Sequence, residues 1–407
     1  MVVQHNMQAA NANRMLNVTT SAQSKSTEKL SSGYRINRAA DDAAGLTISE
    51  KMRKQIKGLD RASTNAEDGV SAVQTAEGAL TEVHSMLQRM NELATQSANG
   101  TNSNTDRKAI QDEIDQLTTE IDRVSETTKF NETYLLKGDG AEKAHNVNAH
   151  DAGLDGVTLT DKGDKVDVTL KTLNAGDKVS IAGKNYTIGS SVADAQALVT
   201  GQQTDGGSIT VNGEKYTWNK NGGAGGTGSW EKGGTATTIT IAGGDVVSDG
   251  TKTLTAMKDV AGGADGIDDN DSTVISAGKA YQLQTAEIVK ASSIGSDTAA
   301  TVKANAGNTN ANYATATTTF TLNKGTVSYK DSLSFNLHVG ADADMTNKIT
   351  VNIDSMNSAG LGVKGIKADT EQDATYAIDA IADAISTVSS QRSSLGAVQN
   401  RLEHTIN

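Results

Sequence analysis

Few residues of this 407-residue chain stand in a pattern that could carry out chemistry. The segment GGAGGTGS, residues 222–229, matches the GxGxxG pattern of dinucleotide sites, but it lies in low-complexity sequence without the strand and helix that such a site needs. The segment GGADGIDDND, residues 262–271, resembles one calcium-binding turn, and a single copy cannot stack into a solenoid. We interpret the first as a flexible loop and the second as a solvated acidic loop.

The histidines and the absence of cysteine limit catalysis further. His145 and His150 stand near Asp139 and Asp151 and could form a weak metal cluster, although a polar surface loop is favoured. The isolated histidines are His5, His84, His338 and His404, and their spacing gives no Ser-His-Asp arrangement. A chain without cysteine has no disulfides, thiolate metal sites or thiol catalysis. We therefore expect no enzyme, no metal site and no cofactor.

Composition narrows the classes of partner. The net charge of −12 argues against a nucleic-acid partner, and no run of about 18 apolar residues predicts a membrane span. The N-terminus lacks the basic and apolar regions of a cleaved secretory signal, so the protein stays inside or leaves by another route. Proline is absent although average usage predicts roughly 20. This suits a chain that stays unfolded and then folds quickly, but compositional drift explains it equally well.

Heptad spacing at both ends of the chain predicts helices that pack together. The apolar positions of three segments step by three and four: Val73, Ala76, Leu80, Val83, Leu87, Met90 and Ala94; Ile110, Ile114, Leu117, Ile121 and Val124; Ile378, Ile381, Ile385, Val388, Leu395, Val398 and Leu402. The loop SANGTNSNTD separates the first two and predicts antiparallel neighbours. A helix from about Leu46 to Ala98 would be roughly 80 Å long.

The middle of the chain predicts β-structure instead. Three segments, VSIAGKNYT, ITVNGEKYT and ITIAGGDVV, align with their glycines at 183, 213 and 243, and VISAGKAYQ around Gly278 is a looser fourth copy. Each is interpreted as strand, tight turn and strand, and Asn212-Gly213 favours a type I′ turn. Alternating apolar residues in 333–356 predict one further hairpin with a longer loop, which we expect to lie along the helices.

Two short stretches remain for interaction surfaces. In QRMNELATQSAN, residues 88–99, Arg89 and Leu93 flank the heptad seam, and Glu113 takes the matching position on the next helix. These three residues could form an exposed contact surface, whereas the spacing alone favours a leucine at the flank of the bundle with two solvated charges. In LSSGYRINRAADDAAGLTIS, residues 30–49, the bulky apolar residues are few, namely Leu30, Tyr34, Ile36, Leu46 and Ile48.

The chain resembles the bacterial flagellins. The resemblance rests on residues 30–49 and 88–99, on EIDRVSETTKFN at 120–131, and on SSLGAVQNRLEHTIN at 393–407. It covers residues 1–138 and 333–407 and leaves the middle unmatched, as expected for that family's variable region. It implies an extracellular subunit that is secreted unfolded, with an export chaperone, through the flagellar type III export apparatus and that polymerises with other flagellin subunits into the filament.

The resemblance also assigns roles to parts of the chain. We expect an α+β fold, in which both chain ends form an elongated antiparallel helical bundle or coiled-coil rod with an inserted β-rich variable region. The expected parts are 1–42, the N-terminal inner-core helix and spoke; 43–140, the N-terminal part of the rod; 141–331, the variable β-rich outer region; and 332–407, the β-hairpin and helix that complete the rod. Leu30, Tyr34, Ile36, Leu46 and Ile48 would belong to the polymerising spoke, which neighbouring subunits would cover.

The same family implies a host receptor, and it leaves alternatives open. By the match to its motif, Arg89, Leu93 and Glu113, with Gln88 and Gln96, would contact the flagellin-sensing Toll-like receptor. A hook–filament junction protein is one alternative. Another is an adhesin whose aromatic residues stack on sugars, namely Trp218, Trp230, Tyr186 and Tyr216. Two departures from the family are expected: the variable insertion precedes the 333–356 hairpin, and the C-terminal end is missing after Asn407, so that residues 1–407 alone would not build a normal filament.

Overall fold

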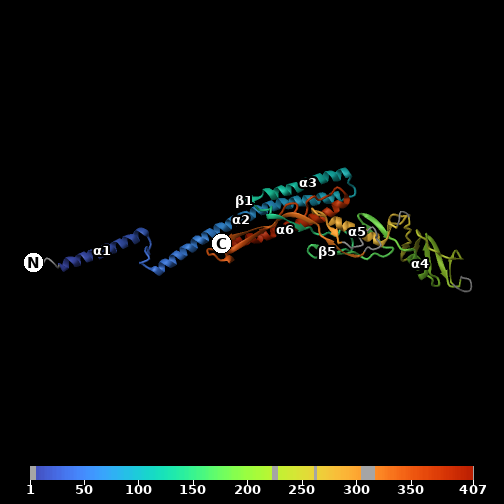
Figure 1. Cartoon of the computed structure of the whole chain (residues 1–407), viewed down its shortest axis with the longest axis horizontal. Coiled ribbons are helices and arrows are strands. Elements are labelled where there is room, and N and C mark those ends of the chain that lie inside the picture. The colour runs from blue at the N-terminus through green and yellow to red at the C-terminus, as the bar shows by residue number, and fades with distance from the viewer. Residues whose placement is uncertain (1–5, 222–227, 261–263, 304–316, 407) are drawn as a thin grey trace. The chain divides into compact units, whose positions relative to one another are not determined.

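The computed structural model describes residues 6–221, 228–260, 264–303 and 317–406 (Figure 1). The chain forms two compact units. The first unit comprises Met1–Val73, Phe335–Val351 and Gly396–Asn407, and the second comprises Gln74–Ser334 and Asn352–Leu395. Six α-helices occur in the described residues: α1 Met7–Ser32, α2 Ala43–Ser97, α3 Asn104–Thr127, α4 Val192–Gly201, α5 Ala277–Ala291 and α6 Glu371–Ile406.

The first unit combines helices with one hairpin. Strands β18 (Leu333–His338) and β19 (Lys348–Ile353) pair, and a 3₁₀ turn at Met345–Asn347 lies in their connection. The core of this unit comprises Ala66 of α2, Ile349 of β19 and Leu402 of α6, with Val70, Leu337, Val339, Val398 and Ile406 packed around them. The hairpin therefore lies against the helices, which confirms the expectation for 333–356.

The second unit contains the parts of α2 and α6 that pack with α3. Arg107 in the first turn of α3 reaches the Ser97 carbonyl at the end of α2, whereas Glu113, further along α3, meets Arg89, which is earlier in α2. Helices α2 and α3 therefore run antiparallel (Figure 1). Helix α6 also runs antiparallel to α2, because Arg392 lies 3.8 Å from Glu77 while Ala368, just before α6, accepts a hydrogen bond from Ser97. The heptad residues of α2 from Val73 to Ala94 are buried, as the sequence predicts.

Two paired strands lead from the helices of the second unit into the middle of the chain. After a short hairpin, β1 (Lys129–Phe130) with β2 (Thr133–Tyr134), strand β3 (Asp139–Asn146) pairs antiparallel with β17 (Thr326–Asp331). The pairing extends from Thr326 opposite Asn146 to Asp331 opposite Asp139. The chain thus enters and leaves the middle region side by side.

The first core of the middle region is built from two sheets and α5. One sheet has the order β15-β16-β5-β4 and the other β14-β7-β6. Their strands are β4 Thr158–Asp161, β5 Lys165–Thr169, β6 Lys178–Ile181, β7 Lys184–Ile188, β14 Val274–Ile275, β15 Thr301–Val302 and β16 Thr319–Asn323. Val168, Ile188 and Phe320 of the sheets are buried in one cluster with Ile288 of α5 and Tyr376 of α6.

The second core of the middle region is a six-stranded sheet packed on α4, with the order β11-β10-β9-β8-β12-β13. Its strands are β8 Ser208–Val211, β9 Glu214–Asn219, β10 Ser229–Lys232, β11 Thr235–Thr237, β12 Val246–Ser248 and β13 Thr253–Thr255. Ile209, Trp230 and Val247 are buried against Ala195 and Val199 of α4. The presence of α4 and α5 shows that the middle is not built of β-modules alone.

The predicted repeat is correct for two copies and wrong for two. The copies around Gly183 and Gly213 are hairpins in which Ala182-Gly183 and Asn212-Gly213 have positive φ, as a two-residue I′ turn requires. Around Gly278 the chain is helical, because the Ser276 side chain accepts a hydrogen bond from the Lys279 N–H and caps α5.

The third copy is displaced in register. Strand β12 begins only after the turn at Gly243 and pairs with β8 and β13. The positions that are structurally equivalent are instead Asp177 and Asp245. The Asp177 carboxylate accepts the Asn174 N–H, and the Asp245 carboxylate accepts the Ala242 N–H, each over 2.7 Å. An alignment on glycines alone misses this equivalence, because the shared element is the aspartate-closed turn before each hairpin.

Candidate functional site

The N-terminal part of the first unit leaves large apolar side chains exposed. Helix α1 begins at an Asn6 cap and ends at Gly33 in the left-handed conformation, and no residue of α1 is buried. We define the N-terminal apolar surface by the side chains with 56–86% exposure in this segment: Met7, Met15, Leu16, Val18, Leu30, Tyr34, Ile48, Met52, Ile56 and Leu59. Exposed apolar residues in such number mark an interaction surface.

Polar contacts hold the connection between α1 and α2. The Asn37 side chain donates to the Glu28 carbonyl over 3.2 Å, and the Arg38 guanidinium lies 2.9 Å from the Glu28 carboxylate. The Asp41 carboxylate accepts the N–H groups of Arg38 and Asn37, and these hydrogen bonds lower the pKa of Asp41. The segment is thus ordered by local hydrogen bonds and not by a core of its own.

The five predicted spoke residues differ in exposure. Leu30, Tyr34 and Ile48 are exposed, whereas Ile36 and Leu46 are half-buried. Ile36 packs on Gly45, where an added Cβ would lie 2.9 Å from the Ile36 Cδ1 atom. The sequence analysis missed Met52, Ile56 and Leu59, although their spacing of four and three from Ile48 continues a helical stripe and could have revealed them.

In the second unit, Arg89 joins α2 to α3. Its Nε donates to the Glu113 Oε1 over 2.9 Å, and its Nη1 lies 3.2 Å from the Glu92 Oε2. The Arg89 and Glu113 side chains are 49% and 44% exposed, and their hydrogen bonds raise the pKa of Arg89. Because guanidinium and carboxylates are both accessible, this cluster can exchange its internal ion pairs for contacts with a polar partner.

The other residues of the predicted receptor surface lie in different environments. Gln88 and Gln96 are exposed, and the Gln88 amide contacts the His84 ring over 3.1 Å. The expected exposure of Leu93 is wrong, since only 2% of this residue is accessible. A flanking heptad position becomes part of the core when a helix has neighbours on two sides, as α2 has in α3 and α6. The exposed surface therefore consists of Arg89 and Glu113 with the two glutamines.

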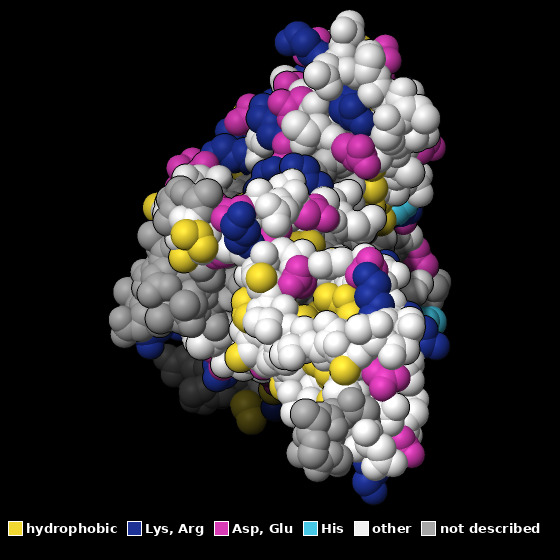
Figure 2. Space-filling view, turned by 90° about the vertical axis from the view of Figure 1, so that its right-hand side faces the viewer, with side chains coloured by type: hydrophobic (Ala, Val, Ile, Leu, Met, Phe, Trp, Pro, Cys, Tyr) yellow, Lys and Arg dark blue, Asp and Glu magenta, His cyan; other side chains and the backbone are white. Residues whose placement is uncertain are grey.

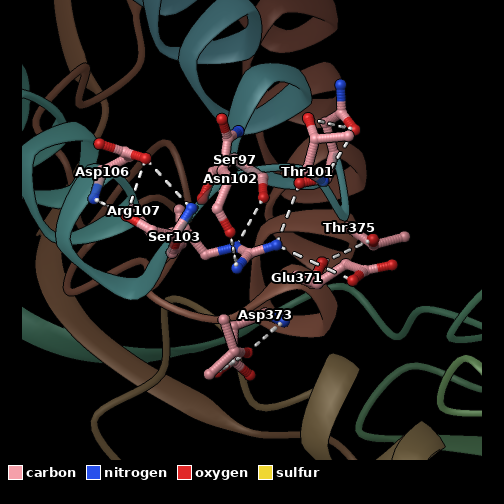
Figure 3. Close-up of polar contacts among 12 residues, drawn as sticks. Ser97, Thr101, Asn102, Ser103, Asp106, Arg107, Glu371, Asp373 and Thr375 are labelled. Atoms are coloured by element: carbon pink, nitrogen blue, oxygen red, sulfur yellow. Dashed lines mark hydrogen bonds and ion pairs between the residues drawn. The ribbon is translucent and has the colours of Figure 1, made fainter.

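Sequence reasoning also missed Arg107, which lies at the turn between α2 and α3 (Figure 3). Arg107 is 7% exposed and donates to the carbonyls of Ser97, Asn102 and Asn99 over 2.9, 2.8 and 3.0 Å. It satisfies carbonyls at the end of α2 that have no helical partner. Next to it, Ser103 and Asp106 form a capping box at the start of α3.

The remaining candidates give no catalytic or metal site in the described residues. His145 stacks on Tyr329 and lies 3.2 Å from Asp331, and no group of three metal-ligating side chains occurs in this part of the chain. Asp268 of the acidic loop is buried, where its carboxylate accepts three backbone N–H groups, so that loop is not simply solvated. Most of the 222–229 segment lies outside the described residues.

The four aromatic residues proposed for sugar stacking do not share one exposed face. Trp230 is buried and meets Trp218 edge-on, with their ring centroids 5.3 Å apart, in the second core of the middle region. Tyr216 packs in that core, whereas Tyr186 packs in the first one. On the face shown in Figure 2, charged side chains of both signs are dispersed and hydrophobic side chains form only small, separate groups.

A helical frame with a β-rich insertion and an exposed apolar surface is the architecture of a structural protein that interacts through that surface. No helix in the described ranges is long and apolar enough to cross a membrane. Family models described as the bacterial flagellin N-terminal and C-terminal helical regions match residues 3–141 and 378–407. The expected absence of the C-terminal end is corrected, because the family's C-terminal helical region is matched at residues 378–407. The expectation that residues 1–407 would build no normal filament rested on that absence and loses its basis.

Relatives support the same family, and one of them matches over the whole length of this chain. The chain is 37% identical to a flagellin of Clostridium tyrobutyricum over 414 residues, which cover 100% of this chain and 87% of that protein. It is 59% identical over 136 residues to a flagellin of Halalkalibacterium halodurans, with 33% of this chain and 50% of that protein covered. A solved structure of FliC from Burkholderia pseudomallei is 18% identical, covers 82% of this chain and 99% of its own, and has a TM-score of 0.31, too low to compare folds.

The chain belongs to the bacterial flagellin family. This is a family of structural proteins and not of enzymes, and its members support the assignment of a structural subunit of the flagellar filament, in the extracellular flagellum. The helical regions at both ends and the β-rich middle agree with the fold class that the sequence predicts.

Proposed function

We propose that the N-terminal apolar surface is the surface through which this chain polymerises with other copies of itself into the flagellar filament. The observation that carries this proposal is that α1 buries none of its residues, although Met7, Met15 and Leu16 are large and apolar. A helix without a packed face is marginal in water, so burial between subunits supplies the missing stabilisation.

Polymerisation is tested with Leu30→Ser and Ile48→Ser, each compared with Val246→Ser. Val246 is an exposed apolar residue of β12, outside the proposed surface. We expect the first two variants to form less pelletable polymer and fewer filaments in electron micrographs, and Val246→Ser to match the unmodified chain. Equal polymer yield from all three variants, or no polymer from the unmodified chain, would refute the proposal.

Export in an unfolded state is the second part of the proposed function. The absence of proline and cysteine removes slow isomerisation and oxidative cross-links from the folding of the chain after transport. The flagellar type III export apparatus and its chaperone would then be partners of the unfolded form. Secretion of the chain from a strain without that apparatus, at the level of the intact strain, would contradict this route.

We infer that the surface of Arg89, Glu113, Gln88 and Gln96 is the ligand face for the flagellin-sensing Toll-like receptor of the host. The exposed Arg89–Glu113 pair supports this role, because it presents a guanidinium and carboxylates that a partner can engage. Leu93 contributes by packing beneath the surface, since it is buried.

The receptor role is tested by a cell reporter assay with Arg89→Ala and Glu113→Gln. The control is Arg123→Ala, which removes the exposed Arg123–Glu120 pair from the same helix as Glu113. We expect the first two variants to need at least about tenfold more protein for half-maximal activation, a loss of about 1.4 kcal/mol in binding, and the control to activate like the unmodified chain. Full activity of both variants would remove this assignment.

The two alternatives have less support. The relatives reported above are named flagellin, which favours a filament subunit over a hook–filament junction protein. The sugar-binding adhesin has less support because its four aromatic residues form no common stacking surface: Trp230 is buried, and Tyr186 packs in a different core. Specific binding of the full chain to sugars on a glycan array would support the adhesin hypothesis again.

A further inference from the structure

The turn between α2 and α3 contains an Asn-Gly pair in a distinctive setting. The Asn99 Oδ1 accepts hydrogen bonds from the Thr101 N–H over 3.2 Å and from the Thr101 hydroxyl over 3.1 Å. A side-chain carbonyl that accepts the N–H two residues later folds its carboxamide back over the intervening peptide. In the described residues, no backbone hydrogen bond engages the N–H of Gly100.

We propose that Asn99 is a site of spontaneous deamidation and that Thr101 promotes the reaction. The Gly100 nitrogen loses its proton to solvent base and bonds to the Asn99 Cγ, forming a five-membered succinimide. The Cγ–Nδ2 bond breaks, and Nδ2 takes a proton and leaves as ammonia. Water then opens the ring to aspartate or isoaspartate, and no oxidant or reductant is needed.

Thr101 acts on the step in which charge develops. As the Gly100 nitrogen adds to Cγ, negative charge accumulates on the Asn99 Oδ1, which is the atom that the Thr101 hydroxyl and N–H already contact. Donors placed at a developing oxyanion lower the barrier to its formation. Asn99 and Gly100 are both exposed, so water and base reach them.

A second Asn-Gly pair in the described residues is held differently. The Asn212 Oδ1 accepts the Val246 N–H over 2.9 Å, and the Asn212 Nδ2 donates to Asp245 over 2.8 Å. Both contacts direct the carboxamide toward β12 and away from the following Gly213. Among the Asn-Gly pairs that lie wholly in the described residues, one is therefore in a reactive setting and one is in a protected setting, which provides an internal control.

The role of Gly100 can be tested by substitution, because an alanine fits there without backbone strain. An added Cβ at Gly100 would lie 3.4 Å from the Glu371 Oε2, an ordinary contact, and Gly100 does not have positive φ. Gly100→Ala is therefore tolerated by the fold while its methyl group obstructs ring closure. The equivalent change at Gly213 would be strained, because φ there is +83°.

The test follows deamidation of the full chain during incubation at 37 °C and mildly alkaline pH. Peptide mass spectrometry and enzymatic methylation of isoaspartate report the product at each asparagine, and isoelectric focusing reports the added negative charge. We expect Asn99 to react at least about tenfold faster than Asn212 in the folded protein, and the two rates to converge in concentrated guanidinium chloride. We expect Thr101→Val to slow the reaction at Asn99 at least about threefold, with Thr101→Ser restoring it and Gly100→Ala slowing it further.

The outcomes decide whether Thr101 promotes deamidation at Asn99 or has no effect on it. Equal folded-state rates at Asn99 and Asn212 would overturn the proposal, and so would a Thr101→Val variant that deamidates at the unmodified rate. Slowing in Thr101→Val together with restoration in Thr101→Ser assigns the effect to the hydroxyl. Thermal unfolding of each variant shows whether the turn itself is intact, because a loosened turn lowers the melting temperature in both threonine variants.

Discussion

Arg107 of α3 donates from its Nε to the Ser97 carbonyl of α2 over 2.9 Å, within a turn of only a few residues. Together with the bonds to Asn102 and Asn99, this contact gives one buried guanidinium three backbone acceptors, and Glu371 lies 3.8 Å away (Figure 3). Arg107 thus ties the end of α2 to the start of α3 and brings the start of α6 beside them.

The first prediction concerns this guanidinium. Arg107→Ala leaves buried carbonyls without donors, so we expect it to lower the free energy of unfolding by about 2–4 kcal/mol. Arg107→Lys should recover only part of the loss, because an ammonium cannot reach three divergent acceptors at once. Urea denaturation followed by circular dichroism measures both. A loss no larger than that of Arg123→Ala, whose exposed pair contributes little, would show that the three hydrogen bonds are not important for stability.

The second prediction compares two glycines within α2. A Cβ on Gly69 would overlap the Leu337 side chain and lie 3.2 Å from the Leu402 Cδ1, so Gly69→Ala should destabilise the protein by about 1–3 kcal/mol. Gly78 has no atom within 4 Å of an added Cβ, so Gly78→Ala should stabilise it by about 0.5–1 kcal/mol. Thermal unfolding measures both variants, and shifts of the same sign would contradict the close packing of hairpin and helix.

The third prediction concerns pH. Asp379 of α6 is exposed but partly desolvated, and this partial desolvation raises its pKa; His150 opposes the rise, whereas Asp151 and Asp383 add to it. The folded protein therefore keeps this proton to a higher pH than the unfolded chain does. The stability that this group contributes is full at low pH and is lost as the pH rises through the folded-state pKa.

Asp379→Asn cannot ionise and should avoid this loss. Because solvent screens an exposed carboxylate, we expect a rise in melting temperature of no more than about 1 °C at pH 7, which disappears near pH 3, below the ordinary carboxyl pKa. Asp112→Asn, at an exposed position of α3, is the control and should change neither value. A rise that is equal at both pH values would assign the effect to something other than ionisation.

The fourth prediction separates the two roles of leucines in the interaction surfaces. Leu93→Ala opens a cavity in a packed core and should cost about 2–4 kcal/mol of unfolding free energy. Leu30→Ala changes a side chain that is 86% exposed and should cost less than about 0.5 kcal/mol. Denaturant titration of the isolated protein measures both. A near-neutral Leu93→Ala would mean that Leu93 is available to a partner after all.

The helices were predictable because each heptad seam repeats over several turns. A helix from about Leu46 to Ala98 is expected from spacing, and α2 runs from Ala43 to Ser97. Leu93 was misplaced because heptad labels describe one neighbour, whereas two helices pack on α2. Arg107 was missed because its partners are backbone carbonyls, which leave no mark in the side-chain pattern.

The middle region was predicted less well because its signals are short. Ala182-Gly183 is a hairpin turn, whereas Ala277-Gly278 begins a helix. The two differ in what surrounds them: Ser276 caps the second, and a run of helix formers follows it. A dipeptide alone therefore does not decide between turn and helix.

The strand pair of β3 and β17 has a consequence for how such a protein can change over time. Because Asp139 and Asp331 stand opposite each other, the whole stretch between them is connected to the helices at a single point, where its two ends pair. Replacing, shortening or exchanging that stretch would require only that the two strands still meet. The sequences of the helical regions and of the inserted middle region can therefore evolve at different rates.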